Sequence, residues 1–187
     1  MDTRTERRSF LAAAGAVVSG CMSGNNEPNE TGAFSVSSLA FEDGEEVPTE
    51  YTCDGANDLP PLRIEDVPSE AETLTLVVDD PDAPGTTYVH WLLWNLPADT
   101  EQISQGVVHG PAISELGGAE QGTNDNGDVG YFGPCPREGD GPHSYRFTLY
   151  AVDKEIEVEA GATRDELDEA LNGSTVGTAR LTGTYER

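Results

Sequence analysis

Basic side chains are scarce in this chain of 187 residues, where 10 Lys and Arg stand against 35 Asp and Glu for a formal net charge of -25. Nucleic-acid binding needs clustered Lys and Arg to displace counterions, so this balance excludes a nucleic-acid partner. No apolar run approaches the roughly 20 residues of a membrane-spanning helix. The phosphate-loop pattern G-x-x-x-x-G-K-S/T and the hydrolase pattern G-x-S-x-G are also missing, as are H-E-x-x-H and C-x-x-C.

Enough apolar material is nevertheless present for a folded core. Hydrophobic residues make up 36% of the chain, and 21 Gly add to them, which is ordinary for a globular protein. The length favours one compact domain. The acidic residues are spread along the chain rather than gathered in a long run, so they do not indicate a disordered acidic tail.

The first twenty residues are typical of an export signal. Arg7 and Arg8 precede a short Ala- and Gly-rich apolar stretch, which predicts a secretory signal of the twin-arginine type over 1–20. The segment 18–21 (VSGC) resembles a lipobox, so Cys21 is the predicted lipid attachment site. Residues 21–33 then form a flexible tether to a domain at 34–187. The alternative is an unstructured start with a chance pair of arginines.

The rest of the chain is predicted to be mainly β. Strand patterns occur at 34–39, 73–78, 88–96, 144–152 and 178–185. Thr163 and Glu166 form a capping box that predicts one short helix, with Gly173 just past its end. The Gly- and Asn-rich stretch 117–130 is predicted to be a long irregular loop.

Two histidines have unusual surroundings. His90 lies within the most apolar strand pattern, where a core histidine held by one hydrogen bond is the ordinary interpretation, and His143 follows a Gly- and Pro-rich loop. The acidic stretch 79–82 is by itself a turn signal. Cys53 and Cys135 would reach an oxidising compartment after export and could pair, or they could be two small buried side chains.

Several segments in one order resemble the phosphatidylethanolamine-binding protein family, and in particular its prokaryotic Raf kinase inhibitor-like branch. They are 51–55 (YTCDG), 60–62 (PPL), 80–84 (DPDAP), 90–91 (HW), 95–97 (NLP), 130–136 (GYFGPCP), 143–147 (HSYRF) and 181–187 (LTGTYER). The resemblance covers the chain from about residue 34 to its last residue.

This resemblance implies a β-sandwich-like fold with one or two short helices and a small anion-binding pocket near the surface. The residues it implies for ligand binding are Asp80, Asp82, Pro84, His90, Gly133, Cys135, His143 and Tyr145. A carboxylate such as Asp80 could orient a histidine and raise its basicity. Ser144 stands where the family usually has Arg, and Arg146, on the same face of a regular strand, is a candidate substitute.

We therefore expect a non-enzymatic module that binds a small anionic or phosphorylated ligand, with no cofactor and no metal. It would be exported and anchored to the outer face of the cell membrane through lipid on Cys21. One alternative is an inhibitor or regulator of a protease or kinase, acting through the rim of the pocket. Another is a zinc-dependent hydrolase using His90, His143 and a carboxylate.

The net negative charge of the chain can be interpreted once an anionic ligand is expected. A strongly negative domain repels an anionic ligand, so its field is not built to steer that ligand. Acidity spread over the whole surface is typical of proteins that work in concentrated salt, where such repulsion is screened. The composition therefore predicts a halophile and favours an archaeon as the source.

Overall fold

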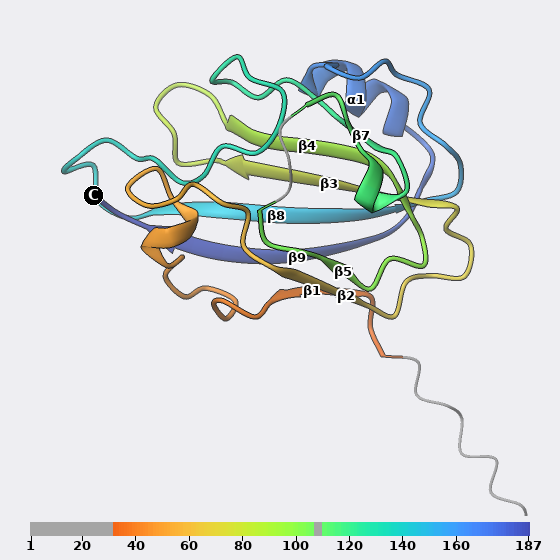
Figure 1. The fold of residues 1–187 in the computed structure, drawn as a ribbon, viewed down its shortest axis with the longest axis horizontal. Coiled ribbons are helices and arrows are strands. Elements are labelled where there is room, and N and C mark those ends of the chain that lie inside the picture. Colours follow the sequence, from red (N-terminus) through yellow and green to blue (C-terminus); the bar gives the residue numbers. More distant parts are fainter. Residues whose placement is uncertain (1–31, 107–109) are drawn as a thin grey trace, which may run out of the picture. The chain divides into compact units, whose positions relative to one another are not determined.

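The computed structural model describes residues 32–106 and 110–187 (Figure 1). The predicted signal at 1–20, the lipid site Cys21 and most of the tether lie outside these residues. None of the helices in the described part of the chain is long and apolar enough to cross a membrane.

Two antiparallel sheets form the body of the domain (Figure 1). The larger has the strand order β6-β7-β4-β3-β8-β9 and the smaller has the order β1-β2-β5. In chain order the strands are β1 (Ser35–Ser38), β2 (Leu62–Glu65), β3 (Thr73–Asp80), β4 (Tyr88–Pro97), β5 (Gln102–Ile103), β6 (Ala112–Ile113), β7 (Ala119–Gln121), β8 (His143–Val152) and β9 (Thr175–Tyr185). The mainly β prediction is confirmed.

The main hydrophobic core lies between the two sheets. It joins Val36, Leu62 and Ile103 of the small sheet to Leu76 and Phe147 of the large one. All eight residues of β3 are buried, which explains why no charged residue precedes the two aspartates at its end.

The other face of the large sheet carries a second, smaller core. Val77 and Leu92 of this face pack with Leu167 and Leu171 of the helix α1 (Arg164–Leu171). The predicted capping box is present, because Thr163 and Glu166 bond each other's backbone N–H groups. Gly173 has φ 78°, the left-handed conformation predicted for the residue after the helix end. Two short 3-10 turns, at Thr49–Tyr51 and Ser114–Leu116, complete the helical elements of the described residues.

The prediction of a wholly irregular loop over 117–130 was wrong in one part. Residues 119–121 form β7, which pairs with β4 through Leu93↔Gln121 and Trp94↔Glu120. Gln121 also accepts a hydrogen bond from the buried Trp91 indole. The strand β7 therefore forms because it pairs with β4, and the sequence of its three residues does not by itself predict a strand.

Candidate functional site

The polar side chains of the site lie at one end of the central strands of the large sheet. Because β4 and β8 both run antiparallel to β3, the last residue of β3 and the first residues of its two neighbours meet at this end. This places Asp80, Tyr88 and His143 around one cavity of about 330 Å³. The cavity is lined by Asp80, Ala83, Pro84, Thr86, Tyr88, His90, Phe132, Cys135, Pro136, Arg137 and His143.

Asp80 and His143 form a buried pair at this end of the strands. His143 Nδ1 lies 2.8 Å from Asp80 Oδ2, and both side chains are less than 10% exposed. The other carboxylate oxygen, Oδ1, accepts a hydrogen bond from the backbone N–H of Asp82 at 2.8 Å. A carboxylate bonded to a ring N–H fixes the orientation and tautomer of the imidazole. Asp80 therefore holds His143 in place, as the sequence suggested for one of the histidines.

His90 is held from the opposite side by the loop that follows β7. Its Nδ1 lies 2.7 Å from the Phe132 carbonyl oxygen, and the Phe132 N–H donates to the His90 carbonyl. The ring also stacks on that of Phe132, with centroids 5.9 Å apart. Burial lowers the pKa of His90, and this outweighs the backbone carbonyl of Phe132 and the charge of Asp80, which raise it.

Tyr145 lies behind the pocket wall rather than on it. Its side chain is fully buried and its ring meets His90 edge-on at 5.2 Å. The hydroxyl makes no hydrogen bond of good geometry with the described residues. Burial, and next the negative charge of Asp80, raise the pKa of this phenol. The ring of Tyr145 thus packs against the rings of both histidines on the side away from the cavity.

Asp82 is also set back from the cavity. Its Oδ2 accepts the backbone N–H of Ser144 at 2.8 Å, and this bond, followed by one from the Ser144 hydroxyl, lowers the pKa of Asp82. The link ties the turn after β3 to the start of β8. Ser144, the residue that departs from the family pattern, therefore acts in positioning the turn.

Arg146 does not replace the missing arginine, so that expectation was wrong. Its guanidinium forms two hydrogen bonds with Asp79, at 2.7 and 3.0 Å. Arg164 of α1 binds the same carboxylate at 3.2 Å. Asp79 is buried on the helix-covered face of the sheet, and two guanidiniums compensate its charge there.

The loop 133–136 is fastened to the segment 51–57 by several bonds. The Gly133 N–H donates to Asn57 Oδ1 at 2.8 Å, and the Cys53 N–H donates to the Pro134 carbonyl at 3.1 Å. A Cβ at Gly133 would lie 2.4 Å from the Tyr51 carbonyl oxygen, so only glycine fits. Because its N–H is already used, Gly133 has no backbone donor left for a ligand.

A disulfide closes the same contact. Cys53 and Cys135 are bonded, with Cα atoms 5.4 Å apart, which decides the question that the sequence left open. Of the predicted ligand residues, Asp80, Pro84, His90, Cys135 and His143 line the cavity, whereas Asp82, Gly133 and Tyr145 support its walls.

Sequence reasoning missed Arg137, the one Arg or Lys among the pocket-lining residues. It is exposed and forms no ion pair with any other described residue. A signal was present, because Arg137 directly follows Pro136 in a chain with few cations. The aromatic walls Tyr88 and Phe132 were also missed.

Comparison with known proteins decides the family. The model of the family described as "Phosphatidylethanolamine-binding protein" matches residues 37–186. The chain belongs to the phosphatidylethanolamine-binding protein family. A UPF0098 protein of Methanothermobacter thermautotrophicus is 43% identical to this family member over 148 residues, which cover 79% of this chain and 95% of that protein.

Two further relatives extend the comparison. Escherichia coli YbcL, a solved member of the family, superimposes with a TM-score of 0.77 at 32% identity, covering 83% of this chain and 99% of YbcL. A Mycobacterium tuberculosis protein provisionally named lipoprotein LppC is 35% identical over 207 residues, covering 98% of this chain and 99% of that protein.

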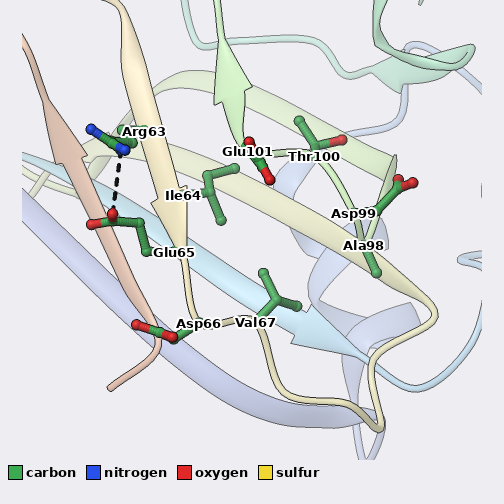
Figure 2. Close-up of a pocket in the computed structure, with 9 residues that line it drawn as sticks. All are labelled: Arg63, Ile64, Glu65, Asp66, Val67, Ala98, Asp99, Thr100 and Glu101. Carbon is green, nitrogen blue, oxygen red and sulfur yellow. Dashed lines mark ion pairs between the residues drawn. The ribbon is translucent and has the colours of Figure 1, made fainter. Parts of the chain in front are cut away.

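A second cavity, of about 410 Å³, lies between the segments 63–67 and 98–101 (Figure 2). Its polar walls are mostly acidic, with Glu65, Asp66, Asp99 and Glu101 all exposed. We call it the acidic hollow. Among the described residues no group of three or more His, Cys, Asp or Glu could hold a metal ion, here or beside His90. The zinc-hydrolase alternative therefore has no ligand set in this part of the chain.

Proposed function

We propose that this domain is a non-enzymatic binding module whose pocket beside His90 holds a phosphate-type or other small anionic head group. The observation that carries the proposal is the pairing of Asp80 with His143 and with the Asp82 N–H. Since both oxygens of the one carboxylate on the cavity wall are held in hydrogen bonds within the protein, the guanidinium of Arg137 is the permanent positive charge that the cavity offers to a ligand. Guanidinium groups form strong, geometrically specific bonds with phosphates and carboxylates.

The cavity also fits an anion with a small organic part. Tyr88, Phe132, Pro84 and Pro136 provide apolar walls around the polar groups, as is usual in small-molecule sites. The loop 133–136 is held by two backbone hydrogen bonds and a disulfide. Such a rigid wall loses little conformational entropy when a ligand binds.

The experiment is a thermal-shift and calorimetric titration of the full chain with inorganic phosphate and phosphorylethanolamine at constant salt. We expect the melting temperature to rise with ligand concentration, and Arg137→Gln to weaken binding about tenfold or more, through loss of a charge-assisted hydrogen bond. Arg180→Gln is the matched control, because Arg180 bonds Thr148 on β8 and does not line the pocket. Equal binding by the Arg137 variant and the wild type would contradict the proposal.

We further propose that the domain is exported and held at the outer face of the membrane by lipid on Cys21. The match to the protein provisionally named lipoprotein LppC supports this, because it spans 98% of the chain and so reaches into the predicted signal. Labelling with a radioactive lipid precursor, such as glycerol, in cells that express the wild type or Cys21→Ser tests it. Label in the serine variant would contradict the assignment.

A further inference from the structure

The hydrogen-bonding role of His90 follows from its neighbour. The Phe132 carbonyl oxygen, 2.7 Å from Nδ1, can only accept a hydrogen bond, so Nδ1 must carry the hydrogen. The Phe132 N–H also donates to the His90 carbonyl, which holds the two backbone segments together beside the ring. The nitrogen left for other contacts is therefore Nε2.

His90 Nε2 is open to the cavity. The bond from Nδ1 to the Phe132 carbonyl is the one hydrogen bond of good geometry between this ring and the described residues, and a smaller contact with the Gly133 backbone also raises the pKa of His90. The side-chain nitrogen and oxygen atoms of this part of the chain that are both buried and unpartnered are Thr75 Oγ1 and Tyr145 Oη. Because His90 Nε2 is not one of them, solvent reaches it, and His90 is a lining residue of the pocket.

Burial, rather than the surrounding charges, favours the neutral form of the His90 ring. Asp80 and Asp79 act in the opposite direction and raise its pKa, although Asp79 is paired with two arginines and Asp80 with His143. Burial then dominates and lowers the pKa of His90. A neutral ring with its hydrogen on Nδ1 carries a lone pair on Nε2. The other titratable groups facing this ring or its cavity are Tyr88 on its own strand, His143 and Tyr145 on β8, and Arg137 on the loop.

We infer that the pocket selects an anion that still carries one proton, such as a phosphate monoester monoanion, whose P–OH donates to His90 Nε2 while Arg137 binds the charged oxygens. A phosphodiester of the same charge has no hydrogen to donate and leaves Nε2 unpaired. The inference rests on the proposed anion-binding function and adds to it the protonation state of the ligand. His90 is then the residue that determines specificity between two anions of equal charge.

The test compares methyl phosphate with dimethyl phosphate, binding to the full chain by calorimetry at pH 5.5 and pH 8. The second pKa of a phosphate monoester is about 6, so the monoester carries its proton mainly at the lower pH. We expect methyl phosphate to bind about tenfold more tightly than dimethyl phosphate at pH 5.5, the value of one additional hydrogen bond to a charged group. At pH 8 this advantage should disappear although the monoester has gained charge.

His90→Asn is the diagnostic variant. The Asn Nδ2 takes the place of Nδ1 and can keep the bond to the Phe132 carbonyl, but nothing replaces Nε2. We expect it to bind both probes equally. A preference that survives in His90→Asn reflects size rather than hydrogen bonding and overturns the inference. Equal binding of both probes by the wild type at pH 5.5 overturns it too, yet leaves the proposed function standing. Binding of neither probe at either pH overturns both.

Discussion

The pocket beside His90 and the acidic hollow differ in how their polar groups are held. In the pocket, Asp80 and His143 are buried and bonded to each other. In the hollow, the one ion pair joins Arg63 to Glu65 at 3.3 Å, with both side chains more than half exposed (Figure 2), and exposed pairs of this kind contribute little to stability. The hollow is the larger of the two cavities, so size does not identify the site.

The walls of the two cavities differ as well. The pocket combines three ends of core strands with a loop that is bonded and cross-linked to the segment 51–57. The hollow lies where β2 ends and where the chain passes from β4 to β5, at the margin of the small sheet. Binding groups must be held in one geometry to be effective, and only the first cavity meets that condition.

The largest expected effect comes from removing the covalent part of the pocket. Cys53→Ala with Cys135→Ala opens a link between residues 82 apart in sequence, and we expect a loss of about 2–4 kcal/mol of stability, because the unfolded chain gains freedom. Denaturant titration measures it, and reduced wild type should match the double variant. Because the backbone bonds of the loop remain, anion binding at low temperature should persist. A double variant as stable as oxidised wild type would contradict this account.

A second comparison sets one buried carboxylate against one exposed carboxylate. Asp80→Ala leaves His143 Nδ1 and the Asp82 N–H without acceptors, and we expect it to cost about 2–3 kcal/mol. Asp99→Ala in the acidic hollow removes no bond of this kind, and its effect should stay within about 0.5 kcal/mol. Unfolding free energies of both variants measure the difference. Equal losses would mean that the two cavities are not built differently.

The smallest effect concerns pH. Burial lowers the pKa of His90 in the folded state below the ordinary value of 6.5, so below pH 6.5 the unfolded chain binds a proton that the folded chain does not. The contribution of neutral His90 to the free energy of unfolding is therefore fully present above pH 6.5. As the pH falls from 6.5 toward the folded pKa, the free energy of unfolding decreases by about 1 kcal/mol per pH unit or less. Melting temperatures from pH 7.5 to 5.5 should fall more steeply for the wild type than for His90→Asn. Parallel curves of melting temperature against pH for the two proteins would contradict this role of His90. Asp82, whose pKa is lowered from 3.8, titrates below this range.

Local patterns predicted the elements whose residues carry their own signal. β3, β4 and β8 appear in the sequence as apolar or alternating runs, and α1 as a capping box followed by two leucines. The short strand β7 could not be predicted, since it depends on pairing with β4 across the sheet. The family resemblance indicated the lining residues Asp80, His90 and His143, whereas composition alone favoured a core role for His90.

The roles of the arginines required the structure. Arg146 was expected at the pocket because it shares a strand face with Ser144, but β8 places it opposite Asp79, whose buried charge attracts it. Arg137 has no strand pattern around it, and its position depends on the loop being bonded to the segment 51–57. Likewise the pairing of two cysteines 82 residues apart depends on a distance that their spacing does not contain.

That cross-link also has a consequence for a cleaved chain. Asp80, His90 and Phe132 all lie between Cys53 and Cys135 in sequence, while His143 lies outside this covalent ring. A protease that cuts once between the two cysteines would therefore leave a single covalent molecule, whose two fragments separate on a gel only after reduction. The histidine pair would stay joined through that nick, because His90 and His143 are linked either along the chain or through the sulfurs.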